Sequence, residues 1–169
     1  MVGKLRIFLS VGTTALIGLG GGGALAQAQS GDDAGFARQL WQQLRAARMV
    51  GDDAIRTRPY QGTDPHGAVL EYLEQTVSVG GTSGLAIVKR NYGGQDVSVE
   101  RVWRQRDLRP ETTVMFRREG YDPQNANWFW AKYNPDGSVD AAGKVDGCIG
   151  CHRNAAGGDY VYSYNLPQR

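Results

Sequence analysis

The first clear pattern along the chain is a segment whose apolar positions recur every three to four residues. Between Asp32 and Gly51 these positions form one stripe along a helix. The carboxylate of Asp32 or Asp33 can cap the first free amides, and Gly51 is placed to end the helix. The stripe consists of Phe36, Leu40, Leu44 and, beside them, Trp41. We therefore predict one amphipathic helix over this segment.

Beyond residue 67 apolar and polar positions alternate, which is the period of a β-strand. β-Branched and aromatic residues fill these runs, and Gly, Pro, Asn and Asp separate them, as in "REGYDPQNAN" and "NPDG". The gaps are short, so antiparallel connections fit them better than parallel crossovers. The predicted strands are Ala68–Leu73 (which also fits a short helix), Gly84–Tyr92, Val97–Trp103, Thr112–Arg117 and Asn127–Tyr133. The fold class we predict is α+β: an N-terminal helix, a mainly antiparallel β-sheet and a C-terminal loop.

The N-terminus has the three parts of a secretory signal peptide. Lys4 and Arg6 form a charged start, an apolar and glycine-rich run follows, and Ala24 and Ala26 supply a small-x-small cleavage site. The apolar run is short for a membrane span, which makes a retained anchor the weaker interpretation. We predict a signal peptide over residues 1–26, with cleavage after Ala28 as the close alternative, and one domain over residues 27–169. The protein is then expected in the periplasm.

The numbers of basic and acidic residues indicate which kinds of binding partner to expect. The chain has 19 Lys and Arg against 17 Asp and Glu. Lys4 and Arg6 leave with the predicted signal peptide, so 19 − 2 = 17 basic residues face 17 acidic ones. Such a balance argues against binding to nucleic acid or to an anionic membrane surface.

The sequence "CIGCH" at Cys148–His152 holds the chain's only two cysteines and one of its two histidines. A structural zinc site needs four ligands, and His66 offers only one more. A disulfide is compatible with export, whereas a thioredoxin-type pair needs a βαβ setting that this chain lacks. Only C-x-x-C-H haem attachment also explains the histidine. We predict one covalent haem c per chain, with thioether bonds to Cys148 and Cys151 and His152 as the proximal iron ligand.

A sixth iron ligand would be a histidine or a methionine on the other side of the haem. The candidates are Met49, which fits helix-face packing, Met115, which fits the sheet core, and His66, which fits a hydrogen-bonded turn residue. None resembles a dedicated ligand, so we expect an open distal site. A six-coordinate electron-transfer cytochrome and a haem-free binding domain with a disulfide remain alternatives.

Several motifs together resemble the cytochrome P-460 and cytochrome c′-beta family. They are "GLAIVKRNY", "TTVMFRREGYDPQNANWFWAKYNPDG", "GKVDGCIGCH" and "DYVYS". The resemblance covers most of the chain after the "PYQGTDPHG" region. It implies a β-rich monohaem protein, usually a homodimer, with five-coordinate iron. The P-460 branch oxidises hydroxylamine, and the c′-beta branch binds nitric oxide and carbon monoxide. We therefore expect a small nitrogen species or carbon monoxide as ligand, turnover of hydroxylamine as one alternative, and a redox partner cytochrome.

The resemblance also singles out Lys89, which matches the lysine that P-460 proteins cross-link to the haem ring. In a strand, Leu85, Ile87 and Lys89 share one face. If that face meets the haem, an ammonium group points at an apolar cofactor, which is unusual unless it is shifted or bonded. Otherwise Lys89, near the end of its strand, extends to water.

Further residues have a functional and a structural interpretation each. An arginine-rich segment can bind a haem propionate or an acidic partner, or form a solvated edge: Arg101, Arg104, Arg106 and Arg109. Aromatic residues can wall the haem or the dimer seam, or fill the core: Trp128 and Trp130. The candidates for a distal acid–base group are Glu100, Glu111 and Asp140. Two residues after the motif can cap the haem edge: Asp159 and Tyr160.

Overall fold

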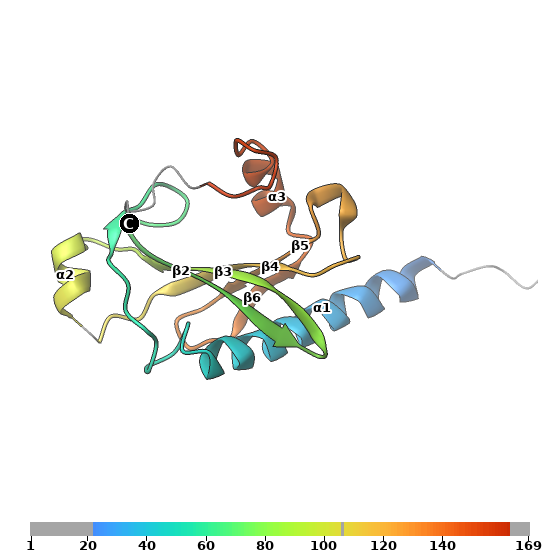
Figure 1. The fold of residues 1–169 in the computed structure, drawn as a ribbon, viewed down its shortest axis with the longest axis horizontal. Coiled ribbons are helices and arrows are strands. Elements are labelled where there is room, and N and C mark those ends of the chain that lie inside the picture. Colours follow the sequence, from blue (N-terminus) through green and yellow to red (C-terminus); the bar gives the residue numbers. More distant parts are fainter. Residues whose placement is uncertain (1–21, 106, 163–169) are drawn as a thin grey trace, which may run out of the picture.

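The computed structural model describes residues 22–105 and 107–162. One antiparallel sheet of six strands runs in sequence order, so each strand pairs with the next along the chain. Its strands are β1 (Tyr60–Gln61), β2 (Val69–Val79), β3 (Thr82–Tyr92), β4 (Glu111–Arg117), β5 (Trp128–Tyr133) and β6 (Val139–Gly143). The helices are α1 (Gly22–Ala46), α2 (Val99–Arg104), the 3₁₀ turn η1 (Pro123–Asn125) and α3 (Asp146–His152). The predicted α+β class is confirmed (Figure 1).

The predicted signal peptide falls mostly on residues 1–21, which lie outside the described residues. In the part of the chain that the structure describes, no helix is long and apolar enough to cross a membrane.

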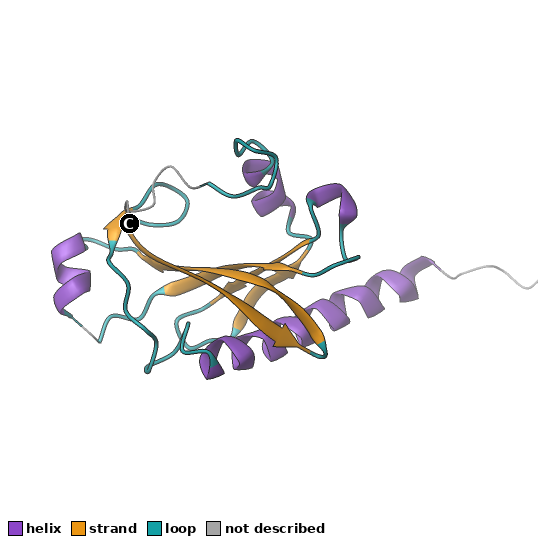
Figure 2. Ribbon diagram, viewed as in Figure 1, coloured by secondary structure: helices purple, strands orange, loops and turns teal. Residues whose placement is uncertain are grey.

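Helix α1 covers one face of the sheet with the predicted stripe (Figure 2). Leu40 and Leu44 are fully buried there. The predicted start and end of this helix were wrong. The helix begins at Gly22, so Asp33 lies inside it and accepts a hydrogen bond from the Tyr121 hydroxyl (2.8 Å) instead of capping. It ends at Ala46, because Arg48 takes a left-handed conformation (φ 56°) before the chain reaches the predicted stop at Gly51.

Four of the five predicted strands are present, and the fifth is a helix. Residues 97–103 alternate in polarity, yet α2 forms there because the Ser98 hydroxyl accepts a hydrogen bond from the Arg101 amide (3.1 Å). Only Val102 of this helix is buried, in a small cluster with Tyr92. The short strands β1 and β6 were not predicted, because two to five residues carry too little periodicity.

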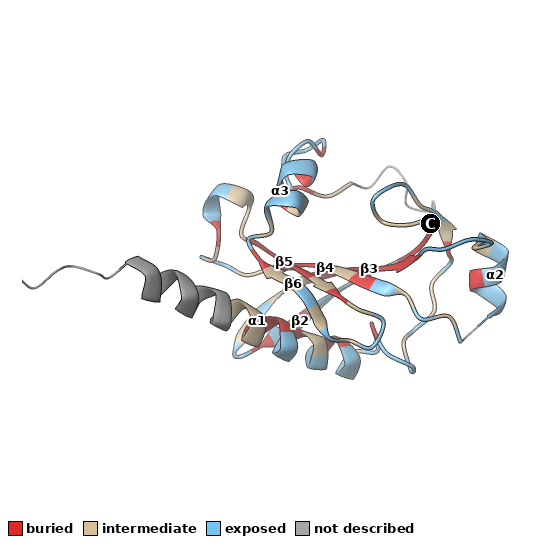
Figure 3. Ribbon diagram, turned by 180° about the vertical axis from the view of Figure 1, so that it is seen from behind, coloured by how far each residue is buried: buried red, intermediate tan, exposed pale blue. Residues whose placement is uncertain are grey.

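The sheet separates two apolar clusters. Successive side chains of a strand point to opposite faces, so Ala86 and Val88 pack under α1 while Ile87 faces the other way. On that second face, Ile87 joins Trp130 of β5 and Ile149 of α3. Burial is concentrated on the middle strands, between the two layers (Figure 3). The second face is therefore a separate apolar surface that α3 covers only in part.

A buried carboxylate ties the segment before β1 to the sheet. Glu71 of β2 is fully buried and is paired with Arg56 (2.9 Å) and with Arg90 of β3 (3.2 Å). Its oxygens also accept hydrogen bonds from the Tyr92 hydroxyl and the Thr57 amide. Because a buried charge is costly without partners, this network fixes the path of the chain into β1 and its loop.

We expect Glu71→Gln to destabilise the fold by about 3 to 5 kcal/mol, since it leaves buried Arg90 without its counter-charge. Urea unfolding monitored by circular dichroism measures the change. The matched control is Glu100→Gln, which breaks an exposed pair with Arg104 on α2 and should cost about 0.3 to 0.5 kcal/mol. Equal losses in the two variants would contradict a stabilising network at Glu71.

Candidate functional site

The cysteine pair lies on a short helix, so the predicted C-terminal loop was wrong. In α3 (Asp146–His152), Cys148 and Cys151 are three residues apart and share a face, and His152 completes that turn. Ile149 is buried in the second apolar cluster and anchors the helix to the sheet. This packing outweighs the low helix propensity of the two glycines in the segment, which is why the sequence pattern did not show a helix.

Both thiols of α3 are free. Cys148 is half-buried and Cys151 is exposed, and burial raises the pKa of the Cys148 thiol. The disulfide that the sequence left open is therefore not formed in this structure. Among the described residues, no three His, Cys, Asp or Glu side chains converge as metal ligands. The pair is available for attachment to another group.

His152 is held in one tautomer. It is buried (6% exposed), and its Nδ1 lies 2.7 Å from the carbonyl oxygen of Tyr160. A carbonyl only accepts, so Nδ1 carries the proton and Nε2 keeps a free lone pair. No described residue bonds to Nε2. Burial lowers the pKa of His152, which favours the neutral ring that a metal needs. Tyr160, which the sequence analysis expects at the haem edge, orients this histidine through its backbone carbonyl.

A pocket lies between α3 and the sheet. Its polar members are His66, Lys89, Thr113, Cys148 and His152, and its apolar wall includes Ile87, Met115 and Trp130. Lys89 shares the face of Leu85 and Ile87, and this face meets α3, as the strand period predicts. Burial lowers the pKa of Lys89, and no acceptor or carboxylate among the described residues pairs with its amine. Lys89 is half-buried and lines the pocket.

The two tryptophans of β5 also lie on this face. Trp128 is fully buried, and its Nε1 donates to the carbonyl oxygen of Asp159 (2.8 Å). Trp130 packs against His152, with their ring centroids 4.9 Å apart. Its Nε1 is buried and has no hydrogen-bond partner in the described part of the chain. Buried polar groups are normally paired. Trp130 therefore lines the pocket and carries an unused donor, whereas Trp128 is packed in the second apolar cluster.

The unpaired groups around the pocket fit a haem. Nε2 of His152 has a lone pair that can bind a metal. Lys89 and Trp130 each have an N–H group without a partner among the described residues, and a carboxylate could accept a hydrogen bond from either. A haem brings both an iron and two propionates, and its flat apolar ring matches Ile87 and Met115.

Sequence reasoning named His66 among the candidates for a sixth iron ligand and favoured a structural role for it. It was interpreted as a hydrogen-bonded turn residue, and its amide does donate to the carbonyl of Thr63 (3.0 Å). Its ring, however, makes no hydrogen bond with any described residue and lies edge-on to the His152 ring, with centroids 6.0 Å apart. Burial, then Lys89 and His152, lower the pKa of His66 to about 4. No local signal marks this role, because His66 and His152 meet only in the folded chain.

The predicted acid–base candidates are not in the pocket. Glu100 pairs with Arg104 on α2 (2.7 Å), and both Glu111 and Asp140 pair with Lys132 (3.3 and 3.1 Å). All three carboxylates are exposed.

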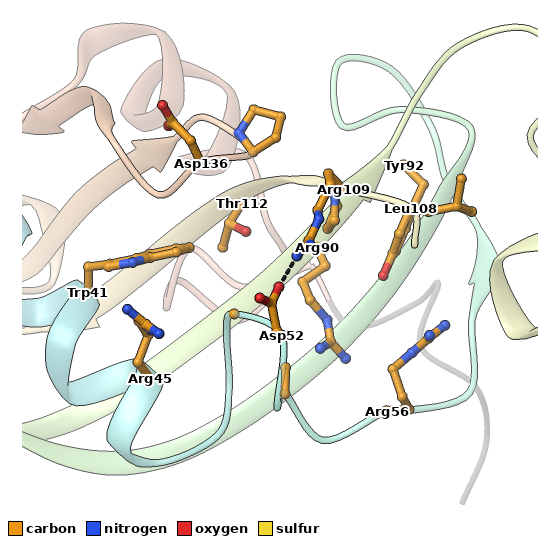
Figure 4. A pocket seen from close by; sticks show the side chains of 14 residues that line it. Trp41, Arg45, Asp52, Arg56, Arg90, Tyr92, Leu108, Arg109, Thr112 and Asp136 are labelled. Carbon is orange, nitrogen blue, oxygen red and sulfur yellow. Dashed lines mark hydrogen bonds and ion pairs between the residues drawn. The ribbon is translucent and has the colours of Figure 1, made fainter. Parts of the chain in front are cut away.

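The predicted arginine cluster does not gather at α3 either. Arg101 and Arg104 lie on α2, and Arg106 is outside the described residues. Arg109 pairs with Asp52 in a second cavity of about 570 Å³ beside α1 (Figure 4).

This second cavity does not resemble a haem site. No cysteine or histidine lines it, and two of its other arginines, Arg56 and Arg90, already pair with Glu71. Arg109 is likewise neutralised by Asp52, which leaves Arg45 as its one arginine without an ion pair among the described residues. The cavity therefore offers little free charge to a ligand.

Comparison with known proteins agrees with the geometry. The family model described as Cytochrome P460 matches residues 53–163, which include β1 to β6, α3 and the Cys-x-x-Cys-His motif. A search of curated proteins and a search of solved structures found no match. The chain therefore belongs to the cytochrome P460 family, and this membership implies a haem cofactor.

Proposed function

We propose that this protein is an exported c-type monohaem cytochrome that binds small nitrogen species at its iron. The observation that carries the proposal is the His152 ring, which is fixed by Tyr160 with Nε2 free, one residue after Cys151. Thioether bonds at Cys148 and Cys151 would attach one haem to α3, and His152 would bind its iron. When bound, the haem supplies an iron that binds small ligands and exchanges single electrons.

The residues of the chain itself have three tasks in this proposal. α3 would hold the haem on the side of β3 to β5, where Ile87 and Met115 form an apolar wall that would exclude water from its ring. Trp130 and Lys89 offer donors to the haem edge. A lowered pKa leaves a larger fraction of the Lys89 amine neutral, and the neutral amine is the form that the cross-link implied by the family resemblance would need.

Nitric oxide and hydroxylamine are the ligands that we propose, with carbon monoxide as a diagnostic ligand. Hydroxylamine oxidation additionally needs a group that removes protons. Glu100, Glu111 and Asp140 lie elsewhere and are engaged in ion pairs, so in this proposal nitric oxide binding is favoured over turnover.

Covalent attachment is tested by the double variant Cys148→Ser/Cys151→Ser, made in a host with working haem-attachment machinery. Haem staining of a denaturing gel should show one haem per wild-type chain and none on the variant, because both thioether bonds are lost. His152→Gly is the matched control: it should keep the covalent haem and lose iron ligation, which added imidazole restores. A wild-type protein without bound haem would contradict the proposed function.

Lys89 is tested by optical spectra of the dithionite-reduced protein. A cross-linked ring should give a broad, red-shifted Soret band in the wild type, and Lys89→Ala should return an ordinary c-haem spectrum. Lys132→Ala, on β5 two strands away from β3, removes an amine that pairs with Glu111 and Asp140 and should leave the spectrum unchanged. If the wild type and Lys89→Ala share an ordinary spectrum, there is no cross-link, and the protein is a gas-binding cytochrome.

Acid should destabilise this pocket. The chain has two histidines, and both line the pocket with lowered pKa values, that of His66 being about 4. Between pH 6.5 and about 4 the unfolded chain therefore binds protons that folded His66 does not, and stability falls as the pH falls through this window. Urea unfolding of the haem-loaded protein at pH 7 and pH 5 measures the loss. The His66→Gln variant should lose less stability between pH 7 and pH 5 than the wild type. An equal loss in both proteins would mean that groups other than His66 cause the pH dependence.

A further inference from the structure

A chain of hydrogen bonds runs from the turn between β4 and β5 to the ring of His152. Nδ1 of His152 donates to the carbonyl oxygen of Tyr160 (2.7 Å), and the Tyr160 hydroxyl donates to Oδ1 of Asn125 (3.0 Å). Asn125 belongs to η1, which rises on the same side of the sheet as α3, opposite α1 (Figure 1). The histidine is therefore linked to a residue from which β5 and β6 separate it in the sequence.

The partners of Asn125 fix the direction of its hydrogen bonds. Its Nδ2 donates to a carboxylate oxygen of Asp122 (2.8 Å), which only accepts, and the guanidinium of Arg153, which only donates, lies 3.4 Å from its Oδ1. Its amide oxygen therefore faces Tyr160, and the Tyr160 hydroxyl donates to it. Asp122 is buried and also pairs with Lys144 (3.6 Å), which gives Asn125 a fixed anchor.

The carbonyl that His152 uses belongs to a residue in an uncommon backbone conformation. Tyr160 has a φ of 67°, in the left-handed region, which a residue other than glycine keeps only where its surroundings hold it. Its side chain is buried in the second apolar cluster, and the carbonyl of the preceding Asp159 accepts from Nε1 of Trp128 (2.8 Å). The bond from its hydroxyl to Asn125 is a further restraint, and it acts on the far end of the side chain.

The hydrogen bond at Nδ1 influences how strongly the other ring nitrogen of His152 can bind a metal. An acceptor at Nδ1 draws the proton toward itself and raises the basicity of Nε2. The distance of 2.7 Å between Nδ1 and the Tyr160 oxygen is at the short end for N–H···O hydrogen bonds, so this effect is strong here. A carbonyl that moved away from the ring would weaken it.

We propose that Asn125 is a positioning residue that acts through Tyr160: it holds the carbonyl of Tyr160 against Nδ1 of His152 and so strengthens the bond between His152 and the haem iron. This inference rests on the proposed function, because it needs the haem on Cys148 and Cys151. Without Asn125 the Tyr160 carbonyl is held less closely, and Nε2 donates less electron density to the iron. Weaker donation favours ferrous over ferric iron, because the ferric ion carries the larger positive charge.

The iron–histidine stretching band in resonance Raman spectra of the ferrous, haem-loaded protein tests the proposal. Asn125→Ala and Tyr160→Phe should each lower the frequency of this band, and the double variant should lower it no further, because both changes break the same hydrogen bond. Tyr121→Phe is the matched control, since it removes a tyrosine hydroxyl that donates to Asp33 of α1 and should leave the band in place. A wild type without the band, an unchanged band in the first two variants, or an equal shift in the control would overturn the proposal.

The reduction potential of the haem provides a second measurement. It should rise in Asn125→Ala and in Tyr160→Phe, and it should stay at the wild-type value in Tyr121→Phe. General destabilisation would not give this pattern, because Tyr121→Phe also removes a hydrogen bond. Equal potentials in all four proteins would overturn the proposal. Haem staining separates the two failures: a stained wild type whose band and potential do not respond rejects only the role of Asn125, whereas an unstained one rejects the proposed function.

Discussion

The alternation of side chains across the pleated sheet is the constraint on which the rest of this structure depends. Once Ala86 and Val88 of β3 pack under α1, Ile87 and Lys89 must face the opposite side. A shift of one residue in the register of β3 would bury Lys89 under the helix and expose the core. The sheet therefore produces a core on one face and, on the other, an apolar surface with a half-buried amine.

That second face differs from an ordinary core in its polar groups. Buried donors and acceptors are usually paired within the protein. On the helix side both oxygens of Glu71 are paired, although Arg90 Nε and Thr57 Oγ1 beside them have no partner among the described residues. Around the pocket, however, His152, Lys89 and Trp130 each keep an unused group. One flat ligand with a metal at its centre and carboxylates at its edge would satisfy all of them, which is why family membership and geometry agree.

The path of the chain explains how two distant histidines meet. The strands follow one another across the sheet, so the loop after β1 and the helix after β6 start at opposite edges. Each extends over the middle strands on the side that α1 leaves uncovered, and their ends come together above β3 to β5. The contact of His66 with His152 is therefore a property of the whole sheet, since β1 and β6 are placed only through the strands between them.

The sequence alone determined the features that depend on neighbouring residues. The stripe of α1, four strands, the Cys-x-x-Cys-His chemistry and the face shared by Ile87 and Lys89 all follow from short-range periodicity and spacing. Packing decided the rest. Ser98 and buried Val102 make α2 a helix despite its alternating pattern, and Ile149 makes α3 a helix despite its glycines. The meeting of His66 with His152 carries no local signal, because only the folded sheet brings these residues together.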